Sequence, residues 1–131
     1  MLIAGAGPAG LMAALTAARS GARVIIADDQ AEFGGSLLHS CESIENRAAS
    51  AWVEDVVKEL ASFPEVQMLP RATVFGYYDH NFVTIAESCT GRFRQRMWRV
   101  RAQQVVLAQG AFERSLVFCN NDRPGVMLAS A

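Results

Sequence analysis

The first ten residues constrain this chain more than any other stretch. A short apolar run, Leu2–Ala4, precedes three glycines in the spacing Gly5-x-Gly7-x-x-Gly10, and a helical pattern rich in alanine and leucine follows. A dinucleotide pyrophosphate site needs this order of strand, glycine turn and helix. Gly5 permits a sharp turn, Gly7 lets the backbone approach phosphates, and Gly10 lets the helix pack on the strand. Pro8 presets φ for the first helical turn, whose free N–H groups and positive dipole end can face an anion.

A complete βαβ pattern surrounds this glycine turn. The helix carries an apolar stripe at helical spacing, formed by Leu11, Ala14, Leu15 and Ala18. Gly21 supplies a C-terminal stop, and Val24–Ala27 has the composition of a second buried strand that ends at Asp28. A carboxylate there can accept hydrogen bonds from both hydroxyls of an adenosine ribose. A glycine triplet also occurs in plain tight turns, but the junction, the acidic residue and the βαβ pattern together favour a dinucleotide site.

The expected cofactor contacts fall in three short segments. The glycine turn and the end of the second strand contribute Gly5, Ala6, Gly7, Pro8, Ala9, Gly10, Asp28, Asp29 and Gln30. In the following loop, the Gly34-Gly35 pair and Ser36 can bring a second backbone segment against a cofactor. A simple turn explains this glycine pair equally well, and both interpretations stay open.

Composition favours one domain spanning residues 1–131. The chain is 51% hydrophobic with a formal net charge of −1, which suits a domain with a real core. Balanced charge predicts neither nucleic acid nor an anionic membrane as a partner. No apolar run has the length of a membrane span. The arginines between Arg92 and Arg101 are best interpreted as a solvated sheet face.

Cysteine and histidine usage gives no sign of a metal or catalytic site. The three cysteines are few, odd in number and widely spaced, which indicates a reduced, cytoplasmic compartment. His39 and Cys41 have no partners at metal-site spacing, so we expect no metal. No general base, nucleophile or redox cysteine pair is visible, and we expect no catalytic residue in this chain.

The rest of the chain predicts a second helix and several strands. Apolar residues at helical spacing predict the helix over 49–60, with Asn46 or Ser43 as its cap and Pro64 at its end. Strands are expected over 66–69, 73–78, 82–86, 97–102 and 104–108. The last is apolar throughout, as in a buried parallel strand. The predicted fold class is α/β, a Rossmann-like parallel sheet with a three-stranded antiparallel meander.

This order of elements is that of the FAD/NAD(P)-binding domain in the glutathione-reductase-like flavoprotein superfamily. Residues 5–28 resemble its phosphate and ribose fingerprint. Residues 105–110 resemble its second motif, usually Ala-Thr-Gly, with Gln109 in place of threonine. The resemblance implies further cofactor contacts at Gln109 and Gly110, and at Val74 in the first meander strand.

Three longer stretches are more specific. Residues 75–82, 95–102 and 120–131 resemble the α subunits of heterotetrameric sarcosine oxidases. That resemblance implies that this chain is the NAD-binding segment of a longer subunit. In that family, the full complex oxidatively demethylates sarcosine to glycine, with tetrahydrofolate as one-carbon acceptor. The amine-oxidising flavin belongs to the β subunit, so the isolated chain should be inactive. Its partners would be the other subunits and the rest of the α subunit.

Two alternatives remain open. The related α subunits of opine oxidases bind FAD with similar motifs, so FAD is the alternative cofactor. The chain could also be a structural module that binds nothing. Both ends look cut, as in a truncated domain, and residues 124–131 look like a helix or strand that has barely started. We therefore expect exposed apolar surface near Val126, Met127 and Leu128, with either self-association of the fragment or partial disorder at the C-terminal end.

Overall fold

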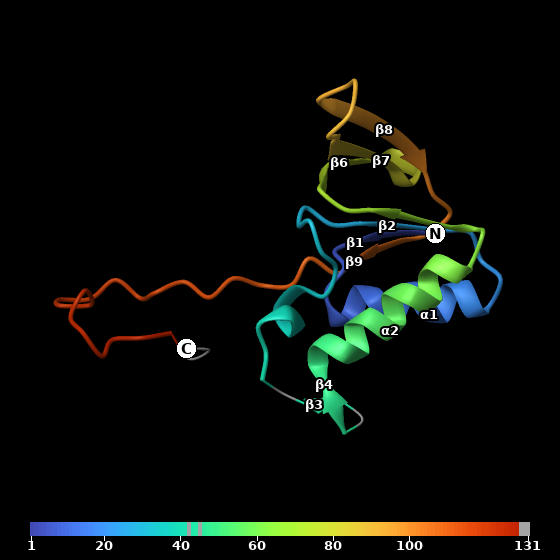
Figure 1. The fold of residues 1–131 in the computed structure, drawn as a ribbon. Coiled ribbons are helices and arrows are strands. Elements are labelled where there is room, and N and C mark those ends of the chain that lie inside the picture. Colours follow the sequence, from blue (N-terminus) through green and yellow to red (C-terminus); the bar gives the residue numbers. More distant parts are fainter. Residues whose placement is uncertain (42, 45, 129–131) are drawn as a thin grey trace.

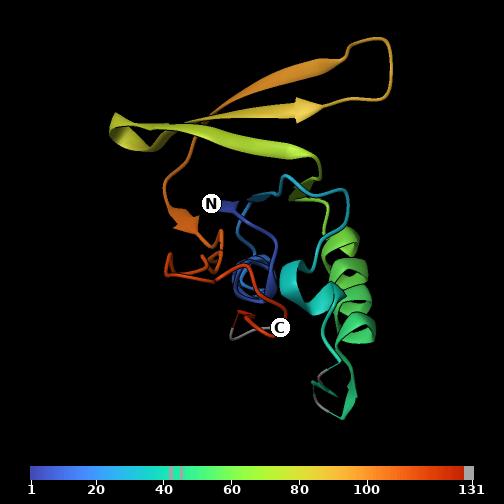
Figure 2. The same cartoon turned by 90° about the vertical axis from the view of Figure 1, so that its left-hand side faces the viewer.

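The central element is a parallel sheet covered on both faces. The computed structural model describes residues 1–41, 43–44 and 46–128. Two helices, α1 (Pro8–Arg19) and α2 (Ala49–Ser62), lie on one face of the sheet and an antiparallel meander lies on the other, as Figures 1 and 2 show. The strand order is β5-β2-β1-β9, with all neighbours parallel. These strands are β1 (Leu2–Ala4), β2 (Val24–Ala27), β5 (Val66–Leu69) and β9 (Val105–Leu107). The predicted fold class is confirmed.

Helix α1 follows the glycine turn as predicted. It begins at Pro8, in the first helical position, and the predicted stripe from Leu11 to Ala18 is buried against the sheet. The helix ends at Arg19, and Gly21 follows with a φ of +81°. The N–H of Gly21 donates to the carbonyl of Ala18 at 2.9 Å, which confirms the glycine stop.

Helix α2 packs beside α1. Its buried face consists of Ala49, Trp52, Val53, Val56 and Leu60. The Arg19 guanidinium forms a two-pronged ion pair with the Glu59 carboxylate, with N–O distances of 2.7 and 2.8 Å. This pairing lowers the pKa of Glu59 below its usual range. Since both side chains are exposed, the ion pair contributes little to the free energy of folding and mainly orients α2 relative to α1.

The predicted cap of α2 is wrong. The N-cap is Ala48, and among the described residues no side chain caps the helix. Asn46 has a φ of +61° and lies in the turn of a small hairpin, β3 (Ser43–Ile44) with β4 (Arg47–Ala48). Ser43 pairs with Ala48 across this hairpin. Both predicted caps are therefore used in a hairpin that the sequence pattern does not reveal.

The meander has the predicted order and direction. Strands β6 (Ala72–Tyr78) and β7 (Phe82–Ser88) are joined by the short 3-10 helix η2 (Asp79–Asn81), and β8 (Gln95–Arg101) pairs with β7. The inner face buries Val83 and Ile85 completely and packs Trp98 and Val100 against them. Arg99 and Arg101 are exposed, as expected for a solvated sheet face.

Strand β9 is parallel to β1, but it is not the buried strand that its composition predicts. Val105 and Val106 are half-buried, and Leu107 is 56% exposed. The cause is its place at the edge of the sheet, where its only neighbour among the described strands is β1.

The chain after Gly110 leaves the body of the domain. Residues 111–128 form no helix or strand and extend away from the sheet, as the orange and red ribbon in Figure 1 shows. The expected helix or strand after Pro124 is therefore absent within the described part, and residues 129–131 lie outside it. Apolar side chains in this segment are exposed, including Phe112, Leu116, Val117 and the predicted Val126, Met127 and Leu128.

This exposed tail should make the chain self-associate, because soluble monomers rarely expose so many apolar side chains together. We expect the mass measured by light scattering to rise with protein concentration. Replacing Leu116 and Val117, which are 80% and 96% exposed, by serine should reduce that rise without unfolding the domain. A parent chain that stays monomeric over the whole concentration range would contradict this expectation.

Candidate dinucleotide-binding site

Two glycines allow α1 to lie directly on the sheet. Gly5 has a φ of +100°, and a Cβ there would lie 2.3 Å from the carbonyl oxygen of Ala108. A Cβ on Gly10 would lie 1.9 Å from the carbonyl oxygen of Gly5. Because both obstacles are backbone atoms, only glycine fits at either position. The turn and packing roles predicted for these two residues agree with this geometry.

The third glycine faces open space. Gly7 is the N-cap of α1, with a φ of −71°, and a Cβ on it would meet no atom within 4 Å. No side chain of the described residues caps the helix. The first-turn N–H groups, which include those of Ala9 and Gly10, therefore have the positive end of the helix dipole behind them and no capping side chain in front. This arrangement can bind an anion.

The Asp28 carboxylate lies beside this helix start. One oxygen accepts a hydrogen bond from the N–H of Ala6 at 2.5 Å, and the other accepts from the N–H of Gln30 at 2.9 Å. These two bonds fix the carboxylate against the glycine turn. A carboxylate has about four acceptor positions, so capacity remains for hydroxyl donors. Asp29 accepts a bond from the Gln30 side chain at 3.0 Å.

The Gly34-Gly35 pair is more than a simple turn. The N–H of Gly34 donates to the carbonyl of Ala6 at 2.8 Å. A Cβ on Gly35 would lie 3.0 Å from the Cα of Gly7. Both residues have positive φ values, +136° and +55°, and Ser36 follows in the 3-10 helix η1 (Gly35–Leu38). The pair therefore packs a second backbone segment against the glycine turn, and its contact with a cofactor stays a prediction.

The remaining predicted contacts divide into two groups. Gln109 follows β9, and its backbone nitrogen lies 2.9 Å from where a Gly5 Cβ would be, so it adjoins the glycine turn. Gly110 comes next, with a φ of +73°. Val74 lies in β6 and packs against the smaller cluster under the meander, which contains Ala27. The structure thus gathers the glycine turn, residues 28–30, residues 34–36 and Gln109, and it places Val74 in a separate apolar setting.

The Asp28 loop is anchored by two residues, Ala72 and Arg71, that the sequence pattern does not single out. The N–H of Ala72 donates to the carbonyl of Asp28 at 2.7 Å, and the N–H of Arg71 donates to the carbonyl of Gln30 at 2.8 Å. Both bonds use backbone atoms only, so side-chain identity carries no signal for them. They tie the loop to the start of the meander.

The described residues contain no group of three or more His, Cys, Asp or Glu side chains that could hold a metal ion. Within the same part of the chain, no helix combines the length and apolar character required to cross a membrane.

Solved structures with the same architecture define the class of this fold. L-proline dehydrogenase from P. horikoshii superimposes with a TM-score of 0.71 at 24% identity, over 95% of this chain and 25% of that one. Thioredoxin reductase from Lactococcus lactis gives a TM-score of 0.65 at 21% identity, over 92% and 38% of the two chains. The chain therefore shares its fold with part of each of these two oxidoreductases.

The chain belongs to the FAD-dependent oxidoreductase family, whose model matches residues 1–109. It is 50% identical to the α subunit of sarcosine oxidase from Corynebacterium sp. (strain P-1) and 48% identical to that of Rhizobium meliloti (strain 1021). An opine oxidase subunit from Agrobacterium tumefaciens (strain Ach5) is 31% identical. All three matches cover the whole chain, but only 15%, 14% and 27% of the respective relatives. The resemblance to sarcosine oxidase α subunits is confirmed. The family description supports FAD, the alternative cofactor, and gives no support to NAD.

The contact of Gly10 with the Gly5 carbonyl predicts a larger loss of stability for Gly10→Ala than for Gly7→Ala. Helix propensity alone would make Gly10→Ala stabilising by about 1 kcal/mol, but the added methyl meets the carbonyl, so we expect a loss of about 1–3 kcal/mol. Gly7→Ala, whose methyl faces open space, should cost less than about 1 kcal/mol, which is the N-cap preference for glycine over alanine. Urea denaturation measures both. A Gly10→Ala variant as stable as the parent would refute this account of the turn.

Proposed function

We propose that this chain is the nucleotide-binding segment of a sarcosine oxidase α subunit, where it binds the ADP half of a dinucleotide. The observation that carries this proposal is the uncapped start of α1 with the Asp28 carboxylate fixed beside it. The pyrophosphate would lie on the first-turn N–H groups, and the adenosine ribose would donate its hydroxyls to Asp28. The bound dinucleotide supplies the redox chemistry, and the chain supplies binding and orientation.

The packing of the neighbouring loops supports this arrangement. Because the backbone of Gly35 lies against Gly7, the segment 34–36 forms a second wall beside the anion position. Gln109 and Gly110 would form the opposite wall, at the end of β9. Val74 belongs to this proposal only through the family resemblance.

The particular dinucleotide that we propose is NAD, as the resemblance to sarcosine oxidase α subunits implies. FAD is the second candidate, and the description of the matched family favours it. Both molecules carry the ADP half, so the same residues would serve either one. The colour of the purified protein distinguishes them, because retained FAD makes the protein yellow, whereas a colourless protein that NAD stabilises against heat favours NAD.

Blocking the anion position tests the site itself. The Cβ of Gly7 would point into open space, so Gly7→Val should fold, yet its branched side chain would occupy the place of the pyrophosphate. We expect at least tenfold weaker binding of NAD, or of FAD if that is the cofactor, by calorimetry. Arg99→Glu, on the exposed face of β8, is the control and should bind like the parent. Equal losses in the two variants, or none in Gly7→Val, would refute the site.

The isolated chain should not oxidise sarcosine. The ionisable side chains among the proposed contacts are Asp28 and Asp29, which accept hydrogen bonds from the Ala6 N–H and from Gln30, and Asp28 would hold the ribose. We infer that the other subunits and the rest of the α subunit supply the reaction centre. Production of hydrogen peroxide or formaldehyde from sarcosine by the purified chain, above a no-protein control, would contradict this.

A further inference from the structure

The outer edge of β9 presents backbone groups that can accept another strand. The carbonyl of Gln104 and the N–H of Ala108 both form hydrogen bonds with β1, at 2.9 and 2.7 Å. Residues two apart in a strand turn their backbone groups to the same side, and the residues between them turn to the other side. Val105 and Leu107 therefore direct their N–H and carbonyl groups away from β1, where no described strand pairs with them.

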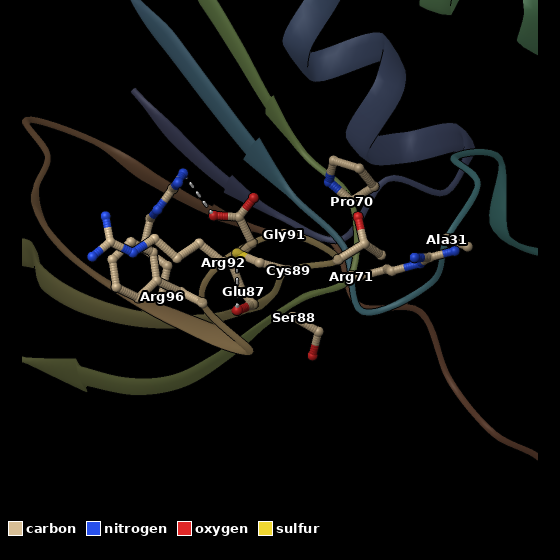
Figure 3. Close-up of a pocket in the computed structure, with 11 residues that line it drawn as sticks. Ala31, Pro70, Arg71, Glu87, Ser88, Cys89, Gly91, Arg92 and Arg96 are labelled. Atoms are coloured by element: carbon tan, nitrogen blue, oxygen red, sulfur yellow. Dashed lines mark hydrogen bonds and ion pairs between the residues drawn. The ribbon is translucent and has the colours of Figure 1, made fainter.

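The other edge strands of the two larger sheets have features that discourage pairing. Pro70, which has no N–H, follows β5 directly, and β6 shifts its register between Val74 and Gly76. In β8, Arg96 places a charge at the edge and pairs with Glu87 of β7 at 3.4 Å, as Figure 3 shows. In contrast, β9 is apolar throughout and contains no proline, register shift or charge. Among the described strands of these sheets, β9 is therefore the edge most open to an added strand.

The tail contains a short segment with the composition of a strand, Leu116–Phe118. Valine and phenylalanine favour strands, and all three side chains are exposed, that of Val117 by 96%. The carbonyls of Leu116 and Phe118 accept hydrogen bonds only from Asn121, at 3.1 and 3.2 Å, so these bonds stay within the tail. Within the described chain, this apolar and uncharged segment forms no hydrogen bond with the body of the domain.

The tail is not placed to pair with β9 of its own chain. The link between the two segments, residues 108–115, is shorter than the dozen or more residues that a parallel crossover needs. After Gly110 the chain leads away from the sheet instead of turning back along β9 (Figure 1). The tail of a second copy has neither restriction.

We propose that Leu116–Phe118 of one copy pairs as an added strand with β9 of a second copy. The exchange is reciprocal, so two copies close a dimer and each β9 receives the other copy's tail. Main-chain hydrogen bonds to Val105 and Leu107 supply the attraction, as in other cases of strand addition. The pairing also covers the Leu107 side chain, which is 56% exposed in the single chain. It gives the self-association expected from the exposed tail a defined contact.

Amide hydrogen exchange of the unmodified chain tests the contact directly. Light scattering first establishes the concentrations at which the chain is monomeric and dimeric. In the dimer, exchange at the N–H groups of Val105, Leu107 and Val117 should slow by about tenfold or more, because they become hydrogen-bonded. The N–H of Ala108, which already donates to Ala4, is the internal control and should not change. Unchanged exchange at Val105 and Leu107 in the dimer, or a chain that never dimerises, overturns the proposal.

Two lysine variants of the full chain block the two halves of the contact separately. Leu107→Lys places a charge on the edge of β9, and Val117→Lys places one in the tail segment. Both positions are exposed, so both variants should fold, which urea denaturation checks. Each variant alone should stay monomeric where the parent chain dimerises. Phe112→Lys, at a tail position that is also 96% exposed but outside the pairing segment, is the matched control and should dimerise like the parent.

Mixing the two blocked variants should restore one pairing. The intact tail of the Leu107→Lys copy can pair with the intact β9 of the Val117→Lys copy, so dimers should reappear, at higher concentration than for the parent. Dimers of Leu107→Lys alone would indicate contacts between tails, and dimers of Val117→Lys alone would indicate pairing between two β9 edges. Either result overturns the proposal, as does a mixture that stays monomeric or a Phe112→Lys variant that loses dimerisation equally.

Discussion

The contact between Gly10 and the carbonyl of Gly5 is the constraint on which the rest of the site depends. It lets the first turn of α1 lie directly against the ends of β1 and β9, at Gly5 and Ala108, and any side chain at Gly10 would push the helix away from them. The close packing places the start of α1 at the carboxyl ends of the parallel strands, where open α/β sheets bind their ligands. The position of the uncapped helix start beside the strand ends thus follows from one missing side chain.

The strand ends then assemble around this point through backbone hydrogen bonds. The N–H of Gly5 donates to the carbonyl of Ala27 at 2.8 Å, and the N–H of Ala108 donates to the carbonyl of Ala4 at 2.7 Å. These bonds hold β2 and β9 level with β1, so Asp28 and Gln109 leave the sheet beside the glycine turn. The Asp28 carboxylate completes the arrangement by accepting the N–H of Ala6.

Much of this arrangement was predictable because it is local. The glycine spacing, the stripe from Leu11 to Ala18 and the strand that ends at Asp28 all express periodicities within a few turns of chain. These patterns predicted the turn and packing roles of Gly5 and Gly10 and the parallel β1–β2 pair. The meander was predicted separately, from strand-like runs between turn residues. Whether each residue of the proposed site contacts a cofactor stays a prediction.

The features that sequence reasoning missed depend on tertiary placement. Two-residue strands such as β3 and β4 carry no period, so Asn46 was interpreted as a cap instead of a hairpin turn.

The central claim is that the glycine turn and the Asp28 loop form one dinucleotide site. The most direct test is a titration of the 15N-labelled chain with NAD, and separately with FAD, followed by amide chemical shifts. The account predicts that the largest shifts with one of these ligands fall on the amides of Gly7, Ala9, Gly10 and Gln30. Saturation with both ligands that leaves these four amides unchanged would contradict it.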